Sequence, residues 1–143
     1  MAITVPVGKI SSQARKLIKV TENAWLEGLK IIKAGARVGD IGATVQAYVE
    51  ANGFSVVRGM VGHGVGYAVH EDPPIPNFGK AGTGLILKSG MVIAVEQMVN
   101  AGGYEIDVLN DGWTEVTVDG SLSAHFEHTV AVTNEGCEIL TAL

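Results

Sequence analysis

The chain has 143 residues, with ten Lys and Arg against fifteen Asp and Glu, and a formal net charge of −5 at pH 7. A net negative charge disfavours nucleic acid as a partner. Apolar residues make up 47% of the sequence, which excludes intrinsic disorder, and no apolar run approaches the ~18 residues that cross a bilayer. We therefore expect one folded domain over residues 1–143, with neither a membrane nor a nucleic acid as partner.

The single cysteine, Cys137, cannot form an internal disulfide, and the first ten residues lack the cationic and apolar segments of a signal peptide. Both observations predict a cytoplasmic protein. Cys137 lies in an apolar context, so we expect a buried small side chain there rather than a nucleophile.

The N-terminal part of the sequence predicts one short strand followed by a helix. Residues 2–8 favour β structure, and Pro6 favours a sheet edge because proline cannot donate to a ladder. Ser11 or Ser12 is suited to cap a helix whose apolar residues fall on one stripe. Gly35 is expected to end this helix.

A second helix and a series of strands follow. Asp40 is a favourable N-cap for the second helix, and Gly53 is expected to end it. From Ser55 onward the apolar residues recur at every second position, which is typical of strands. The expected strands cover residues 55–58, 91–99, 104–109, 114–118 and 124–133, with a last one around Ile139. This order predicts an α+β fold, with two helices packed on a mostly antiparallel sheet.

The stretch GHGVGYAVHEDP, residues 62–73, places His63 and His70 among glycines. We interpret it as a flexible loop that allows close approach of the backbone. It lacks the glycine and lysine spacing of phosphate loops. The His70-Glu71 pair is followed by Asp and two prolines, so the second histidine and the helix of an H-E-x-x-H metal motif are both missing. Taken alone, the loop leaves open whether His63 is a metal ligand or a structural or exposed side chain.

Two glutamates, Glu96 and Glu127, lie inside apolar strand sequences. Burial of a carboxylate is costly unless it is paired or bound to a cation. Together with a histidine they offer a mixed nitrogen and oxygen site, which suits Mn, Fe, Co or Zn. Strand alternation places His125 on the same face as Glu127. The alternative, in which both glutamates face solvent on a half-exposed sheet, stays open at this point.

The order of the segments GHGVG…HEDP, SGMVIAVEQMV and DGWTEVTVDGSLSAHFEHTVAVT resembles the C-terminal half of a type I methionine aminopeptidase. The resemblance runs from about Thr4 to Thr141. Aminopeptidase P and prolidase share a GHGVG-like motif, but the segments EQMVNAGG, DGWT and SAHFEHT are similar to the methionine enzyme. The resemblance implies a metallopeptidase that removes N-terminal methionine from peptides, and a chain that forms one half of the pita-bread fold.

The resemblance also implies roles for individual residues. His63, Glu96 and Glu127 correspond to metal ligands, and Glu127 to the one that bridges two metals. His70 corresponds to a histidine that hydrogen-bonds the peptide and its tetrahedral intermediate, and Trp113 to a wall of the methionine pocket. In the mechanism of the family, a metal-bound water attacks the first peptide carbonyl, and Glu96 is suited to shuttle its proton.

The sequence also departs from the family pattern. The two aspartates that complete the metal pair precede the region of resemblance, and the first acidic residue of this sequence is Glu22. We therefore expect at most one divalent ion (Mn, Fe, Co or Zn) per chain, bound weakly, and little or no activity from the chain alone. His125 stands where the resemblance places a glutamine. It is able to add a ligand, or it is a surface or core substitution.

One half of this fold is expected to expose a sheet edge and apolar surface, both of which invite association. The expected partners are therefore a second copy of the chain, in a homodimer, or a complementing N-terminal half. Three functions stay open. The chain is an aminopeptidase portion that acts when the other half is supplied, a catalytically dead and self-associating half-fold of natural or engineered origin, or a peptide-binding module that uses the cleft around Trp113 and His70.

Overall fold

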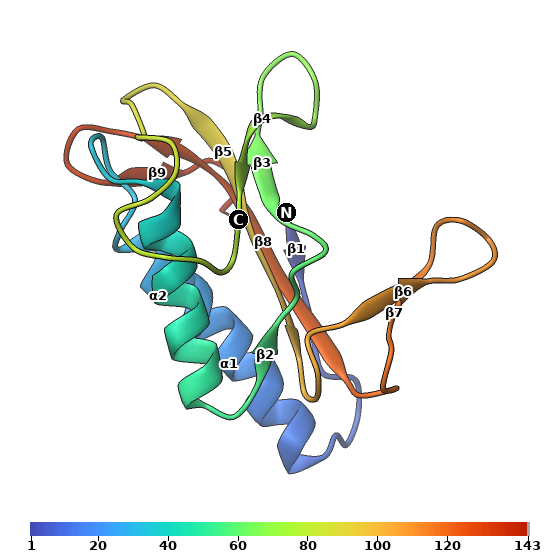
Figure 1. The fold of residues 1–143 in the computed structure, drawn as a ribbon. Helices are drawn as coiled ribbons and strands as arrows, with labels where there is room; N and C mark the ends of the chain where they lie inside the picture. The colour runs from blue at the N-terminus through green and yellow to red at the C-terminus, as the bar shows by residue number, and fades with distance from the viewer. Residues whose placement is uncertain (143) are drawn as a thin grey trace.

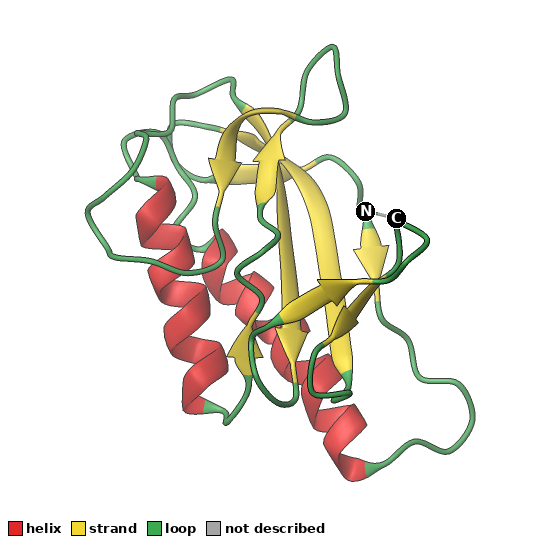
Figure 2. Ribbon diagram, turned by 45° about the vertical axis from the view of Figure 1, so that its right-hand side comes forward, coloured by secondary structure: helices red, strands yellow, loops and turns green. Residues whose placement is uncertain are grey.

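The computed structural model describes residues 1–142 and shows two helices packed on one side of an antiparallel sheet (Figure 1, Figure 2). The main sheet follows the order β1-β8-β5-β3-β4, with β2 paired to β5 and β9 paired to β8. The strands are β1 (Ala2–Ile3), β2 (Ser55–Val56), β3 (Gly62–Gly64), β4 (Glu71–Ile75), β5 (Val92–Asn100), β6 (Ile106–Val108), β7 (Glu115–Thr117), β8 (Ser123–Val132) and β9 (Cys137–Ile139). The predicted α+β class is confirmed.

Helix α1 (Ser12–Leu29) begins as predicted, because the Oγ atom of Ser11 accepts a hydrogen bond from the backbone N–H of Ala14 at 3.1 Å. It ends before the predicted Gly35. The last turn tightens through bonds of the 3₁₀ type, and Gly35, at φ +92°, turns the chain farther on. The helix is fixed to the sheet by Trp25, whose Nε1–H donates to the carbonyl oxygen of Val95 at 2.9 Å.

Helix α2 (Val38–Ala51) begins differently from the prediction. Arg37 is the N-cap, and Asp40 lies three residues later, where its Oδ2 atom accepts from the backbone N–H of Arg37 at 2.9 Å. Asp40 is therefore the acidic partner of a capping box and not the cap itself. Its Oδ1 atom also accepts from the N–H of Gly82 at 2.6 Å, which ties a distant loop to the start of the helix. Backbone donation by Gly82, and then by Arg37, lowers the pKa of the Asp40 carboxyl.

The segment Gly62–Gly64 is strand β3, so the interpretation of the GHGVG motif as a flexible loop is wrong. β3 pairs with β5 on one side and with β4, also predicted as loop, on the other. Glycine is needed at positions 62 and 64 because neighbouring backbone leaves no room for a side chain. A Cβ atom at Gly62 would overlap the carbonyl oxygen of Ala94, and one at Gly64 that of Asp72. The loop that joins the two strands begins at Val65.

The ladder between β5 and β8 is the centre of the sheet, and both strands lie within one residue of their predicted bounds. Phe126 and His128 of β8 point toward the helices, with ring centroids 5.4 and 5.0 Å from that of Trp25. His125 and Glu127 alternate with them and therefore lie on the opposite face, as predicted. The buried core fills the space between the helices and this ladder.

Strands β6 and β7 form a separate two-stranded hairpin that projects away from the main sheet (Figure 1). They confirm the predicted strands at 104–109 and 114–118 in shortened form. The first predicted strand is likewise reduced, to Ala2–Ile3, and pairs with β8 at the sheet edge. Among residues 1–142, no helix has the length and apolar character needed to cross a membrane.

Candidate metal centre

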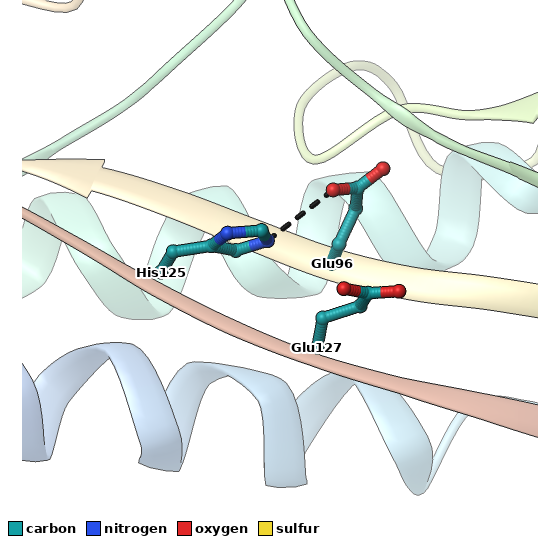
Figure 3. A group of neighbouring side chains, drawn as sticks. All are labelled: Glu96, His125 and Glu127. Carbon is teal, nitrogen blue, oxygen red and sulfur yellow. Dashed lines mark ion pairs between the residues drawn. The ribbon is translucent and has the colours of Figure 1, made fainter. Parts of the chain in front are cut away.

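Glu96 of β5 and Glu127 of β8 face each other directly across the central ladder (Figure 3). The Glu96 side chain is 16% exposed and the Glu127 side chain 20% exposed, so both carboxylates are largely shielded from bulk water. Like charges at directly opposed positions of a ladder repel each other. An arrangement of this kind becomes favourable when a cation lies between the carboxylates.

Two histidines flank Glu96 from opposite sides. His63 of β3 pairs with Ala94, two residues before Glu96, whereas His125 of β8 pairs with Met98, two residues after it. All of these side chains share one face, because alternate residues of a strand point the same way. The Nε2 atom of His63 lies 3.8 Å from Glu96 Oε1, and the Nε2 atom of His125 lies 3.2 Å from Glu96 Oε2.

The tautomer of His63 follows from its backbone contact. Its Nδ1 atom lies 2.9 Å from the carbonyl oxygen of Gly64. Because a carbonyl only accepts, Nδ1 carries the proton and donates it to this bond. In the neutral imidazole, the lone pair of Nε2 then lies on the side of Glu96. A histidine whose other nitrogen is fixed by a carbonyl in this way is typical of metal ligands.

The donor atoms of Glu96, His125 and Glu127 come within reach of one ion. Each residue offers one ligand atom, and these atoms all lie within 4.8 Å of one another. Opposed ligands at ~2.0–2.2 Å from a metal are about 4 Å apart, so a small contraction is enough to close the group around an ion. Imidazole nitrogen with carboxylate oxygen suits the middle and late first-row metals. The side chains present therefore fit a divalent ion.

His63, Glu96 and Glu127 line a cavity of about 440 Å³, and His70 lies at the same cavity. The ring centroids of His63 and His70 are 4.2 Å apart, and His70 is exposed toward solvent. The structure thus brings the three predicted metal ligands and the predicted substrate-binding histidine around one space. His125 reaches this group from the far side of Glu96.

The loop between β3 and β4 carries His70 and is shaped by Glu71. The Oε1 atom of Glu71 accepts from the backbone N–H of Ala68 at 2.7 Å, and the carboxylate lies close against Gly66. Glu71 was noted as the residue directly after His70, but no role was predicted for it. Thr129 was missed. It lines the cavity from β8, and the alternation that relates it to Glu127 identifies it.

Trp113 is not brought to this cavity. It lies in the loop of the β6–β7 hairpin, its surface is 88% exposed, and it lines a separate hollow with Met60 and Val108. Its predicted contact with methionine stays a prediction. Cys137 also lies apart from the site, half-buried near the end of α1, and burial raises the pKa of its thiol.

Comparison with known proteins identifies the family of the chain. Residues 1–134 match metallopeptidase family M24. The chain is 57% identical over 138 residues to methionine aminopeptidase B of Synechocystis sp., covering 96% of this chain and 50% of that protein. It is 54% identical over 142 residues to methionine aminopeptidase of Clostridium perfringens, covering 99% of this chain and 57% of that protein. The chain thus spans about half the length of the curated relatives it matches.

Solved structures give the same result for the fold. Methionine aminopeptidase from Thermotoga maritima superposes with a TM-score of 0.96 at 48% identity, covering 99% of this chain and 57% of that one. X-Pro aminopeptidase from Thermotoga maritima shares the fold at a TM-score of 0.71 and 24% identity. The predicted resemblance to the C-terminal half of a methionine aminopeptidase, and with it the half pita-bread fold, is confirmed. This chain belongs to metallopeptidase family M24.

Proposed function

We propose that this chain forms a metal-holding part of a methionine aminopeptidase, which removes N-terminal methionine from peptides. One observation above all supports the proposal. Glu96 lies directly opposite Glu127, both line a cavity of about 440 Å³, and the Nε2 atom of His63 is 3.8 Å from Glu96. Membership of the metallopeptidase family and the names of the relatives support the choice of reaction.

His63, Glu96 and Glu127 are the residues that would hold the divalent ion, of Mn, Fe, Co or Zn type. When bound, such an ion polarises the scissile carbonyl and lowers the pKa of a water molecule. We expect at most one ion per chain and weak binding. The aspartates that the family resemblance implies have no counterpart in residues 1–143, and the first acidic residue there is Glu22.

The other chemical roles follow from the positions of the side chains. Glu96 is placed to take up and release a proton, because its carboxylate lines the same cavity as His63 and His70. His70 is exposed over the same cavity, its ring 4.2 Å from that of His63, and is placed to donate a hydrogen bond to a peptide carbonyl. A peptide in the cavity then has a proton acceptor and a hydrogen-bond donor beside its first carbonyl.

The substrate class is an N-terminal methionyl peptide. The α-ammonium group of such a peptide suits the acidic side of the cavity, where Glu96 and Glu127 both line the wall. We further propose that a partner covers the edge at β1, either a second copy of the chain or an N-terminal half. The exposed apolar side chains Ile3, Val5 and Val7 at this edge support such a surface. We place the protein in the cytoplasm, on the basis of its single cysteine.

The test is release of methionine from a short peptide that begins with Met-Gly, with a divalent ion and then with a chelator. Glu127→Ala removes one carboxylate of the opposed pair. Glu138→Gln, at an exposed position of β9, is the matched control. We expect turnover that requires the ion, is lost in Glu127→Ala and persists in Glu138→Gln.

Equal turnover in the wild type and Glu127→Ala would contradict the proposed site. If the wild type shows no turnover, the assay is repeated after adding the N-terminal half of a related methionine aminopeptidase. The result decides between an aminopeptidase portion and a chain without this activity. Restored turnover supports an aminopeptidase portion. Continued inactivity overturns the proposed reaction and leaves a dead half-fold, or a peptide-binding module if methionyl peptides bind without cleavage.

A further inference from the structure

His125 has a nitrogen atom without a hydrogen-bond partner among the described residues. The ring as a whole is 36% exposed, but its Nε2 atom is buried. This atom lies 3.2 Å from Glu96 Oε2, in an orientation that does not make a hydrogen bond. A buried polar atom left without a partner costs about 1–3 kcal/mol. A cation between Nε2 and the carboxylates would supply the missing partner, since the ligand atoms of Glu96, His125 and Glu127 lie within 4.8 Å of one another.

The backbone of His125 is held firmly in place. Its N–H donates to the Oγ1 atom of Thr4 at 2.9 Å, and its carbonyl oxygen accepts from the same hydroxyl at 3.0 Å. Thr4 directly follows β1, which pairs with β8 at the edge of the sheet. Neither contact involves the imidazole, so both contacts leave the Nε2 atom of His125 available to another partner.

We propose that the Nε2 atom of His125 is a ligand of the divalent ion, together with Glu96 and Glu127, while His63 binds from the other side of Glu96. This inference rests on the proposed function for the presence of an ion and adds a ligand to it. The ligand set then contains two imidazole nitrogens and two carboxylates. A second imidazole raises the preference for Zn²⁺ and Co²⁺ over Mn²⁺, which favours oxygen donors.

The alternative is a protonated His125 that forms only an ion pair with Glu96. The two arrangements differ in what the imidazole does when metal is added. A ligand Nε2 atom bonds Zn²⁺ and carries no proton, whereas an ion-paired ring keeps the proton on Nε2 whether it leaves Glu96 or stays beside it. The ¹⁵N resonances of the His125 side chain report this difference in the wild-type chain, without any substitution.

The experiment measures Zn²⁺ and Mn²⁺ affinity of the full chain by competition with a chromophoric chelator. His125→Gln keeps a polar side chain and leaves both backbone contacts with Thr4 in place. His128→Gln changes the same residue type on the opposite face of β8, where the ring packs on Trp25. Circular dichroism and the midpoint of unfolding without metal establish that each variant is folded.

We expect His125→Gln to lower Zn²⁺ affinity about tenfold or more, and to lower Mn²⁺ affinity less. His128→Gln should stay within a factor of three of the wild type, and the His125 side-chain ¹⁵N resonance should shift on Zn²⁺ binding to that of an Nε2 atom without a proton. Unchanged Zn²⁺ affinity in His125→Gln, with an unshifted resonance and with binding lost in Glu127→Ala, overturns the role of His125 alone. Absence of Zn²⁺ binding in the wild type overturns the proposed metal site as well.

Discussion

Glu96 lies directly opposite Glu127 in the ladder between β5 and β8, so two carboxylates share the cavity face of the sheet. The next pair of the ladder, Gln97 and Phe126, lies on the helix face, where Phe126 packs on Trp25. Strand alternation therefore separates the acidic pair from the apolar core by a single residue step. The pair is repulsive without a cation and favourable with one, and this difference can be measured.

Glu127→Gln is expected to stabilise the chain when metal is absent, because it removes the repulsion with Glu96. The expected gain is about 0.5 kcal/mol in the free energy of unfolding. Denaturant unfolding in the presence of a chelator measures it. The wild type is expected to gain stability from added Zn²⁺ by mass action, while Glu127→Gln gains little. A variant that is less stable than the wild type in chelator, yet still stabilised by Zn²⁺, would argue against repulsion at this pair.

Gly64→Ala is expected to disrupt the site through the backbone. The new Cβ atom overlaps the carbonyl oxygen of Asp72, which belongs to the neighbouring strand β4. We expect a loss of about 2 kcal/mol or more in the free energy of unfolding, together with weaker metal binding through His63. Gly136→Ala is the matched control, since a Cβ atom there meets no other atom within 4 Å. Equal stability of the two variants would mean that β3 tolerates displacement.

Asp40→Asn is expected to destabilise the start of α2 in a pH-dependent way. The pKa of the Asp40 carboxyl is lowered from 3.8 by hydrogen bonds from the backbone of Gly82 and Arg37. A lowered pKa in the folded state means that the stabilisation is complete above the ordinary pKa and is lost as pH falls through the lowered value. We expect a cost of about 0.5–1 kcal/mol at pH 7.

Urea unfolding at a series of pH values measures this effect. The difference between the wild type and Asp40→Asn should stay constant from pH 7 to about pH 5 and shrink below about pH 4. Glu138→Gln, at an exposed position, makes the same change in net charge and supplies the baseline. A difference that stays constant down to the lowest pH would assign the effect to packing and not to the carboxylate.

Self-association is expected through the edge at β1. Val5 and Val7 are 60% and 85% exposed beside this short strand. Replacing both with lysine places charges on the edge, which hinders strand pairing between copies. Sedimentation velocity at micromolar concentration should show a dimer for the wild type and a monomer for the double variant. Leu26→Lys, at an exposed position of α1, is the control. A dimer that survives the double substitution would place the interface elsewhere.

The parts of the fold that were predicted depend on local chemistry. Ser11 caps α1 because its hydroxyl reaches a backbone N–H three residues away. The strands β5 and β8 are long, and their alternation marks both faces. The strand β3 was missed because it contains two glycines and has no apolar alternation. What makes it a strand is the neighbouring backbone of Ala94 and Asp72, which is tertiary information.

Some parts of the candidate site were predicted from the sequence, and others were not. The resemblance placed His63, Glu96 and Glu127 together, and the structure brings them to one cavity. The contact between His125 and Glu96 depends on the register of β5 against β8, which alternation within one strand does not define. Trp113 lies in the β6–β7 hairpin, which projects from the main sheet. The position of such a hairpin depends on tertiary contacts, so the sequence around Trp113 could not predict where its side chain lies.

The number of divalent ions bound per chain tests the central claim most directly. Calorimetric titration of the metal-free chain with Zn²⁺ or Co²⁺, in parallel with Glu127→Ala, gives this number. The account predicts one ion per wild-type chain and none for Glu127→Ala, because the opposed carboxylates of Glu96 and Glu127 are the core of the site. Two ions bound with similar affinity by the wild type, or undiminished binding by Glu127→Ala, would contradict it.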